Sequence, residues 1–424
     1  MFTNTKSSSL SFWINHIKHL HHRNMDLGLE RVKYVAKKLK LLHPSPYTII
    51  VGGTNGKGTT CHLLERILIS SGIRVGVYNS PHILYYNERI RIQGKILQDT
   101  DLVQSMKIIE KHRHNISLSY FEFSTLSALQ LFKKFSVDVA ILEVGLGGKL
   151  DATNIINSDI SVITNIALDH TEILGTNRNS IAKQKSGIFR NKKPAIFGEE
   201  NVPKALFNEA NKIGALLYVK NKNWWIKIKK NKKKWSWWNK NYILTALPIP
   251  KIPIENAATA LAIVSCLPFN ISKKNIKNEL QKIQLPGRFQ CIKKNPLIIL
   301  DAAHNPHASA YLSNNIKKIL KKTKKITVIV GMLKDKNIQG TLANFKGIAK
   351  NWNCASIKHE RGATSEELSI HLRGENIKQF NNVVSAWNQT IKDSSKTDCI
   401  LIFGSFHTIS PIMKLLRIST YPKI

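Results

Sequence analysis

Acidic residues, cysteine and long apolar runs are all scarce in this 424-residue chain. The five cysteines are scattered and form no C-x-x-C pair, which argues against a disulfide framework or a structural zinc site. No apolar run approaches the roughly 20 residues needed to span a bilayer. The length and a hydrophobic content of 42% exclude small secreted scaffolds and disordered chains. We therefore expect a soluble, intracellular protein of two or three domains.

The shortage of acid leaves 27 Asp and Glu against 64 Lys and Arg, a formal charge of +37. Clustered cations are typical of nucleic-acid-binding proteins, but Lys is spread along this whole chain, as on a solvated surface. The exception is segment 223–238, where Trp and Lys interleave. It is either a base-stacking platform or an exposed hairpin with strands 224–229 and 234–238. No OB-type fold is evident around it, which favours the hairpin.

The first 25 residues contain no acid and faintly resemble a transit peptide. Apolar residues in the same stretch recur at helical spacing, at Phe12, Trp13, Ile14, Ile17 and Leu20. This spacing is typical of a helix that docks on a folded domain. We favour the docking helix and a cytoplasmic location.

Strands and helices alternate as in a parallel α/β sheet. The expected strands are 47–51, 74–78, 137–144, 159–166, 297–300, 326–330 and 399–403, and the clearest helices are 59–70 and 121–135. The fold class is therefore α/β, with a mostly parallel N-terminal sheet that carries a phosphate-binding loop and a smaller Rossmann-like C-terminal domain. The expected boundaries are residues 1–287 for the first domain, 288–296 for a linker or hinge, and 297–424 for the second domain.

The strongest local signal is a Gly-rich run between an expected strand and an expected helix, Gly53-Thr54-Asn55-Gly56-Lys57-Gly58-Thr59-Thr60. Glycines allow the chain to wrap a polyphosphate, so that backbone N–H groups and the helix N-terminus point at it. Lys57 supplies charge for the outer phosphates, and Thr59 or Thr60 a hydroxyl for phosphate or Mg²⁺. The spacing differs from Walker A because a Gly separates the Lys from the hydroxyl residue.

Two more polar positions follow expected strands. Glu143 lies at the end of strand 137–144, and Asp169 and His170 come just past strand 159–166. Ligands of open parallel sheets collect at this edge, and a carboxylate there is suited to phosphate-bound Mg²⁺. Taken alone, Glu143 is also consistent with a solvated strand end, and His170 with a structural histidine. Because Glu143 and His170 are expected at the same edge of the sheet, we favour a ligand-binding site there.

In order along the chain, these motifs resemble those of the folylpolyglutamate synthases of the Mur ligase superfamily. The motifs that carry the resemblance are residues 53–59, 80–82, 142–148, 168–170, 285–289 and 301–306. Segments 25–32 and 404–407 are similar to those of the bacterial bifunctional dihydrofolate synthase/folylpolyglutamate synthases. The resemblance covers nearly the whole chain and is weakest in residues 1–20 and 215–245.

The resemblance implies an ATP- and Mg²⁺-dependent ligase that adds L-glutamate to 7,8-dihydropteroate, and further glutamates to reduced folates, through an acyl phosphate. Such phosphoryl transfer depends mainly on positioning and charge neutralisation. Implied nucleotide-binding positions are Thr54, Asn55, Gly56, Lys57, Gly58, Thr59, Thr60, Asn256, Arg288, Asp301 and His304. Implied Mg²⁺ ligands are Ser80, Glu143 and His170.

Lys185 matches a lysine that the family carries as a carbamate, which turns a Mg²⁺-repelling ammonium into a carboxylate. With Lys57, Glu143 and His170 it completes the implied catalytic set. Its neighbours Gln184 and Ser186 depart from the Glu-Lys-Ala-Gly common in the family. Taken alone, Lys185 is equally consistent with a surface lysine.

The pterin-bearing substrate is implied to lie near three segments, which are Asp26, Leu27, Gly28 and Leu29; Phe121, Glu122, Phe123 and Ser124; and Leu150, Asp151 and Ala152. Phe121 and Phe123 are either stacking surfaces for a flat ring or core residues. Cationic surroundings would suit the anionic glutamate tail.

The alternatives are a Mur-type ligase acting on another precursor, a nucleic-acid-binding NTPase and an inactive remnant. The order of the motifs favours the folate enzyme. We expect small-molecule substrates, no nucleic-acid or membrane partner, and a monomer.

Overall fold

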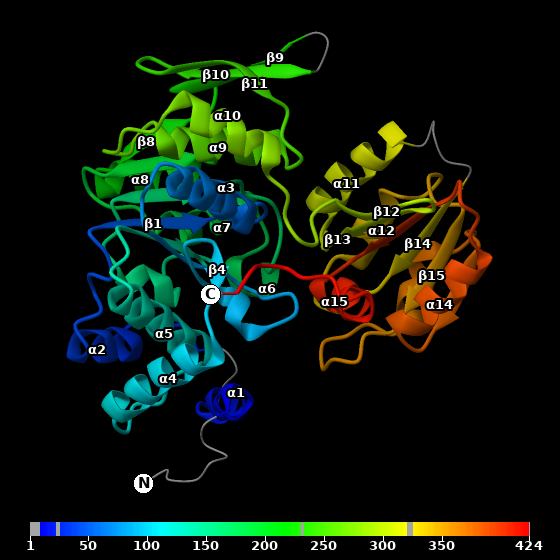
Figure 1. Ribbon diagram of the computed structural model, residues 1–424, viewed down its shortest axis with the longest axis horizontal. Helices are drawn as coiled ribbons and strands as arrows, with labels where there is room; N and C mark the ends of the chain where they lie inside the picture. Colours follow the sequence, from blue (N-terminus) through cyan, green and yellow to red (C-terminus); the bar gives the residue numbers. More distant parts are fainter. Residues whose placement is uncertain (1–8, 23–25, 230–232, 320–324, 424) are drawn as a thin grey trace. The chain divides into compact units, whose positions relative to one another are not determined.

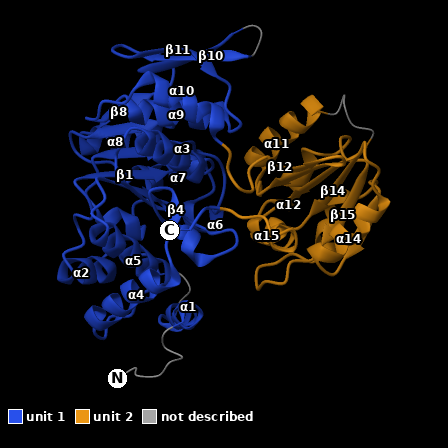
Figure 2. Ribbon diagram, in the orientation of Figure 1, with its two compact units in different colours: residues 1–283, 421–424 blue, residues 284–420 orange. Residues whose placement is uncertain are grey.

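The structure is a computed structural model that describes residues 9–22, 26–229, 233–319 and 325–423. The chain folds into two compact units (Figure 2). The first comprises residues 1–283 together with 421–424, and the second residues 284–420. Among the described residues, no helix is long and apolar enough to cross a membrane.

The first unit is built on an eight-stranded sheet in the order β4-β3-β2-β5-β1-β6-β7-β8. Its strands are β1 (Tyr47–Gly52), β2 (Val75–Tyr78), β3 (Ile90–Ile92), β4 (Lys95–Ile96), β5 (Val139–Glu143), β6 (Ile160–Ile163), β7 (Pro194–Phe197) and β8 (Leu216–Val219). The run from β2 to β8 is parallel, whereas β3 and β4 add antiparallel pairs at one edge. The central strands are buried along almost their whole length, because helices cover both faces.

The helices of the first unit are α1 (Leu10–His19), α2 (Glu30–Lys38), α3 (Lys57–Ser70), α4 (Asp99–Arg113), α5 (Tyr120–Lys134), α6 (Thr171–Leu174), α7 (Arg178–Ser186), α8 (Lys204–Ile213), α9 (Ile254–Val264) and α10 (Lys273–Lys282). In the view of Figure 1, α9 and α10 lie above β1, and α2, α4 and α5 lie below it. The first helix buries Leu10, Trp13 and Ile17 against the unit's core. The docking helix is thus confirmed.

The Trp- and Lys-rich segment forms a sheet of three strands in the order β11-β10-β9. The hairpin of β9 (Trp224–Ile228) and β10 (Lys234–Asn239) is confirmed, although its turn at 230–232 lies outside the described residues. The expectation that it is exposed is wrong for one face. Trp224, Trp235 and Trp237 are buried there, because an unexpected third strand, β11 (Ile243–Pro248), pairs with β10 and packs on α10.

The second unit has a six-stranded sheet in the order β12-β13-β17-β14-β15-β16. Its strands are β12 (Gln290–Lys294), β13 (Leu297–Asp301), β14 (Ile326–Val330), β15 (Asn351–Ala355), β16 (Ile377–Phe380) and β17 (Cys399–Phe403). All pairs are parallel except β12 with β13. The helices are α11 (Pro306–Ile319), α12 (Ile338–Ala343), α13 (Ser365–Ser369), α14 (Val383–Asp393) and α15 (Phe406–Leu415). The Rossmann-like expectation is confirmed.

Two features correct the expected domain limits. Residues 288–296 are not a free linker, because β12 lies within them and pairs with β13 in the sheet of the second unit. Residues 421–424 belong to the first unit and not to the second. There the backbone N–H of Ile96 donates to the Pro422 carbonyl at 2.9 Å. The chain therefore passes between the units twice.

Candidate active site

The Gly-rich loop leaves β1 and enters α3 with a backbone that favours glycine. Gly53 and Gly56 have φ angles of 133° and 81°, where a side chain is strained. A Cβ atom on Gly56 would also clash with the amide of Asn256, from α9. Helix α3 begins directly at Lys57, so its first N–H groups lack partners within the helix. The loop and helix start thus have the form of an anion site.

Residues just past β6 hold this loop in place. The Asn165 side chain accepts from the Asn55 N–H and donates to the Asn55 carbonyl, both at 2.9 Å. Thr164 Oγ1 donates to the same carbonyl at 2.6 Å, and Thr54 exchanges two 3.1 Å bonds with Ala167. The sequence prediction missed Thr164 and Asn165. The available signal was two polar residues directly after an apolar strand.

Two ammonium groups meet at a single backbone carbonyl. Lys57 Nζ and Lys185 Nζ donate to the Gly53 oxygen at 3.1 and 3.0 Å. Within the described part of the chain, neither has an ion-pair partner. Burial, together with the charge of Lys57, lowers the pKa of Lys185 to about 7. Lys185 is therefore not a surface lysine, and the site has an excess of positive charge suited to an anion.

Glu143 lies at the end of β5, beside the first turn of α3. A Cβ atom on Gly58 would be 3.4 Å from Glu143 Oε2. That oxygen accepts from Asn79 Nδ2 at 2.8 Å and from the Ser80 backbone N–H at 3.1 Å. The carboxylate is only 5% exposed, and its Oε1 has no hydrogen bond to a described residue. A buried carboxylate with one uncommitted oxygen fits a divalent cation.

His170 lies after β6, at the edge of the sheet where the Gly-rich loop also lies. It comes three residues after Ala167, which is hydrogen-bonded to Thr54 of that loop. Its backbone is left-handed, with φ 51°, and its N–H donates to Asp169 Oδ1 at 2.9 Å. Over the described ranges, no three His, Cys, Asp or Glu side chains form a metal cluster. The predicted set of Ser80, Glu143 and His170 contains only two such side chains, so a cation there needs further oxygens, as from phosphate.

The predicted residues of the second unit gather where β13 ends. Asp301 accepts from the backbone N–H groups of Phe289 and Ala303, both at 2.7 Å. Burial raises the pKa of the Asp301 carboxyl, against the opposing charge of Arg288. The Arg288 guanidinium lies 5.0 Å from the Phe406 ring centre, and His304 Nδ1 is 2.9 Å from the Ala302 carbonyl oxygen. This is the carboxyl edge at which parallel sheets bind ligands.

The expected pterin segment 121–124 lies at the start of α5. Phe121 is partly exposed and packs against Gly145 and Tyr78. Phe123 is fully buried, so of its two alternatives the structure shows a core residue. Its two neighbours are also buried and are bonded internally, and their contact with substrate stays a prediction. Glu122 binds Arg31 and the Ser119 N–H, and Ser124 binds Tyr86 and Tyr120.

The other two predicted substrate segments contain both exposed and buried residues. Leu27 and Leu150 are 43% and 40% exposed, and Leu29 is partly buried. The space beside Gly28 is open, since a Cβ there would meet no atom within 4 Å. Asp26 pairs with Arg31 at 2.7 Å, and Met25 lies outside the described residues. Ala152 and Asp151 are buried. The Asp151 carboxylate accepts from the N–H groups of Gly145 and Leu146 at 3.0 and 2.9 Å, so it shapes the loop after β5. Substrate contact by Asp151 and Ala152 stays a prediction.

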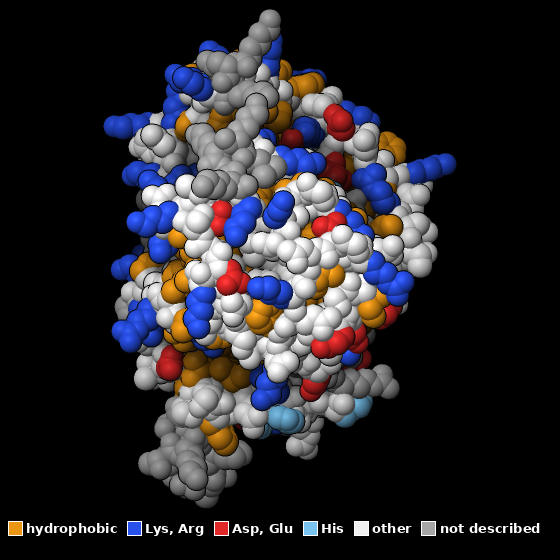
Figure 3. Space-filling view, turned by 90° about the vertical axis from the view of Figure 1, so that its right-hand side faces the viewer, with side chains coloured by type: hydrophobic (Ala, Val, Ile, Leu, Met, Phe, Trp, Pro, Cys, Tyr) orange, Lys and Arg blue, Asp and Glu red, His pale blue; other side chains and the backbone are white. Residues whose placement is uncertain are grey.

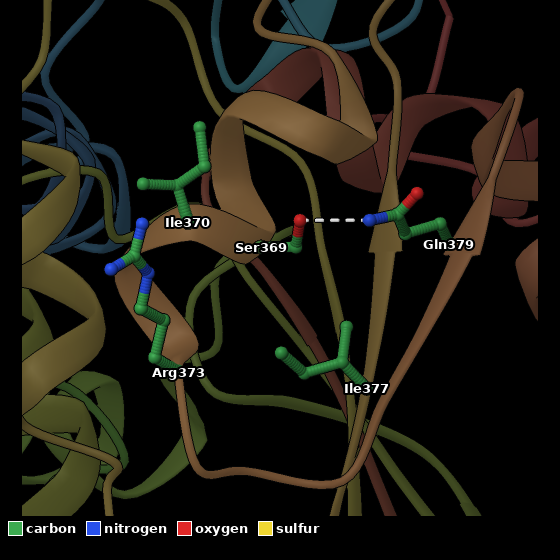
Figure 4. A pocket seen from close by; sticks show the side chains of 5 residues that line it. All are labelled: Ser369, Ile370, Arg373, Ile377 and Gln379. Carbon is green, nitrogen blue, oxygen red and sulfur yellow. Dashed lines mark hydrogen bonds between the residues drawn. The ribbon is translucent and has the colours of Figure 1, made fainter.

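A cavity of about 530 Å³ lies elsewhere, beside β16 in the second unit (Figure 4). It is lined by Ser369, Ile370, Arg373, Ile377 and Gln379. Gln379 donates to the Ser369 hydroxyl at 2.8 Å. None of these is a predicted site residue, and β16 is the opposite edge of the sheet from β12 and β13. The cavity is therefore separate from the candidate site.

Comparison with known proteins matches both units to one family. Residues 51–264 match the Mur ligase middle domain, and residues 287–406 match the Mur ligase glutamate ligase domain. The dihydrofolate synthase/folylpolyglutamate synthase of Escherichia coli K12 is 45% identical over 410 residues, which cover 97% of this chain and 96% of that protein. The Haemophilus influenzae protein of that name is 44% identical over 95% of this chain and 97% of its own length.

Solved structures that are similar to this chain belong to the same family. The structure of E. coli FolC in complex with DHPP and ADP is similar with a TM-score of 0.94, at 45% identity, over 98% of this chain and 99% of that one. The Yersinia pestis bifunctional folylpolyglutamate synthase/dihydrofolate synthase complexed with AMPPNP and Mn ion gives 0.92, at 47% identity, over 98% and 100%. The chain therefore belongs to the dihydrofolate synthase/folylpolyglutamate synthase family, ATP-dependent ligases of the Mur ligase type.

Proposed function

We propose that this protein uses ATP to join L-glutamate to 7,8-dihydropteroate, forming dihydrofolate, and to add further glutamates to reduced folates. The family supports the reaction. The observation that carries the location is the Lys57 ammonium at the Gly53 carbonyl, next to the buried Lys185 amine and with the Glu143 carboxylate beside the same helix start. Positive charge binds phosphates, and the carboxylate binds the cation that accompanies them.

Lys57 and the backbone N–H groups of residues 56–59 hold the phosphates of ATP in this proposal, since those of Thr54, Asn55 and Thr60 are bonded within the protein. The Gly53 carbonyl that Lys57 now engages is a weak partner for an ammonium, so a phosphate oxygen can replace it without leaving a buried charge unpaired. Thr59 or Thr60 adds a hydroxyl from the first turn of α3. Thr60 Oγ1 is buried without a hydrogen-bond partner among the described residues.

Ser80, Glu143 and His170 would hold Mg²⁺. Bound there, the ion neutralises charge on the transferring phosphoryl group. The uncommitted Oε1 of Glu143 supports this assignment, because a carboxylate oxygen that no protein group engages is available as a ligand for a divalent cation.

Lys185 is suited to carbamylation by its chemistry. With a pKa of about 7, a large share of the amine is neutral at physiological pH. The neutral nitrogen attacks the carbon of CO₂, an N–C bond forms, and one proton leaves to solvent. The product is an anion in place of an ammonium that would repel Mg²⁺.

The reaction then follows from charge placement. A carboxylate oxygen of the folate substrate attacks the γ-phosphorus, ADP leaves, and an acyl phosphate results. The amine of L-glutamate attacks its carbonyl carbon, phosphate leaves, and the amine loses a proton as the amide forms. Asn256, Arg288, Asp301 and His304 contribute to nucleotide binding.

We assign residues 284–420 as the glutamate ligase domain. We expect a cytoplasmic protein that is a monomer, and light scattering of the purified protein tests the oligomeric state.

The decisive assay offers the purified protein ATP, Mg²⁺, L-glutamate and dihydropteroate, each omitted in turn. Phosphate release that requires both organic substrates is the expected result. Tetrahydrofolate in place of dihydropteroate then tests the second activity separately. Phosphate release stimulated by nucleic acid alone would overturn the proposal and favour an NTPase.

A further inference from the structure

A continuous chain of buried and partly buried polar side chains leads away from Glu143. Asn79 Nδ2 donates to Glu143 Oε2 at 2.8 Å, and Arg91 Nη2 donates to Asn79 Oδ1 at 2.7 Å. Asn79 follows β2, Glu143 ends β5, and Arg91 lies in β3. Three strands of one sheet are thus linked through a single amide.

Arg91 determines which way this amide faces. A guanidinium has only donors, so it requires the oxygen of the Asn79 side chain. The Asn79 amide nitrogen is therefore aimed at Glu143. Since Oε2 of Glu143 is engaged by Asn79 and by the Ser80 N–H, Oε1 is left for a ligand.

Arg91 is itself fixed by a buried ion pair with Glu65. The guanidinium donates through Nε and Nη2 to the two carboxylate oxygens at 3.1 and 2.8 Å. Arg91 is 1% exposed and Glu65 is fully buried. Burial raises the pKa of Glu65, but the charges and hydrogen bonds of Arg91 and His62 together outweigh it and hold the pKa below its usual range. Glu65 lies on α3, the helix that begins with Lys57, so the pair joins the phosphate loop to the cation side of the site.

The last residues of the chain cover this pair. The Tyr421 ring centre lies 4.5 Å from the Arg91 guanidinium and 5.8 Å from the His62 ring. The Pro422 carbonyl accepts from the Ile96 N–H at 2.9 Å, and the backbones of Lys423 and Ile96 form an isolated parallel β-bridge. This C-terminal segment, residues 421–423, returns to the first unit after the chain has passed through the second.

We propose that Asn79 and Arg91 are positioning residues for Glu143, and that Tyr421 of the C-terminal segment keeps them in place. The inference rests on the proposed role of Glu143 in cation binding. Without the Asn79 amide, Glu143 loses the donor that fixes its rotamer. Without the Tyr421 ring, water reaches Arg91, its cation–π contact is lost and its pair with Glu65 weakens. The last residues of the chain thereby set the affinity of the site for its divalent cation.

The test measures Mn²⁺ binding to the full chain saturated with AMPPNP, by electron paramagnetic resonance or calorimetry. Asn79→Leu, which keeps the volume and removes both polar atoms, should weaken Mn²⁺ about 10–100-fold. Tyr421→Ala should weaken it severalfold, whereas Tyr421→Phe, which retains the ring, should bind as the unmodified protein does. Affinity for AMPPNP without metal should stay unchanged. Should Tyr421→Ala not fold, Tyr421→Leu replaces it.

Unchanged Mn²⁺ affinity in Asn79→Leu, or equal loss in Tyr421→Phe and Tyr421→Ala, would overturn the inference. A separate variant, Glu143→Gln, distinguishes its failure from that of the proposed function. If Glu143→Gln abolishes Mn²⁺ binding and Asn79→Leu does not change it, only the positioning role is lost. If Glu143→Gln binds Mn²⁺ normally, the cation site itself is wrongly assigned.

Discussion

The most informative residues of the first unit are the two lysines at Gly53. Removing Lys57 should leave the fold intact, since its ammonium bonds only to exposed or loop carbonyls. It should lower kcat by about 100–1000-fold, because a charged donor aimed at the transferring group is lost. Steady-state phosphate release by Lys57→Ala checks this. Lys222→Ala, which removes an exposed lysine, is the matched control, and near-normal turnover by Lys57→Ala would refute the assignment.

Lys185 gives a prediction of stability. Its pKa is lowered from 10.5 to about 7 by burial and by Lys57, so between these values the unfolded chain binds a proton that the folded chain does not. The free energy of unfolding therefore rises with pH in that window, and the lysine destabilises the protein below it. Lys185→Met should stabilise the protein at pH 7 by roughly 2–4 kcal/mol and abolish activity.

Denaturant titrations at pH 6, 7 and 9 measure this effect. The stability gain of Lys185→Met should shrink toward pH 9, because the folded protein no longer holds a buried charge once its amine has lost the proton that the unfolded chain still carries. A constant gain across the three pH values would show that the lysine is not held as a buried ammonium.

At this scale, local motifs identified Lys57, Glu143 and Arg288, because each stands in a short run with a distinctive order. Asn79, Thr164 and Asn165 were missed, since their partners come from other strands and only the folded sheet brings them together. The choice between stacking and core packing for Phe123 stayed open for a related reason. The sequence places it at a helix start, but only packing decides which side of that helix faces the core.

Among elements, the most apolar strands were predictable, whereas β7 and β15 were missed although both lie inside their sheets and are mostly buried. The runs at β1, β14 and β17 are apolar and β-branched because both faces of a parallel sheet are covered, and the expected ranges match within one residue. The missed strands β12 and β11 lie at sheet edges. β12 reads Gln-Cys-Ile-Lys-Lys, so half of its side chains meet water and its sequence resembles a loop.

The Trp-rich sheet yields a prediction for one element. Trp237 is fully buried and Trp238, its neighbour on β10, faces the other side and stacks on Trp225. Trp237→Ala should lower the free energy of unfolding of the first unit by about 3–5 kcal/mol through the cavity it leaves. Trp238→Ala, the matched control, should cost less than half as much. Equal losses in chemical denaturation would show that both faces are packed.

At the scale of the whole molecule, the charge of +37 is dispersed rather than gathered. Figure 3 shows Lys and Arg scattered over one face, with uncharged surface between them. Such a surface lacks the geometry for reading bases, but it creates a long-range positive potential. Folates gain negative charge with each added glutamate, so this potential favours longer substrates.

The expected consequence is a salt-dependent KM that grows with the length of the glutamate tail. Between about 50 and 500 mM NaCl, the screening length falls roughly threefold, to about 4 Å. KM for a folate triglutamate should therefore rise severalfold, KM for dihydropteroate should rise little, and kcat should stay constant because chemistry occurs in a site that salt does not reach. Sucrose at matched osmolality controls for effects other than screening. An equal change in KM for both substrates would assign the salt effect to ATP or to the pterin site, and an unchanged KM for the triglutamate would show that surface charge has no part in substrate capture.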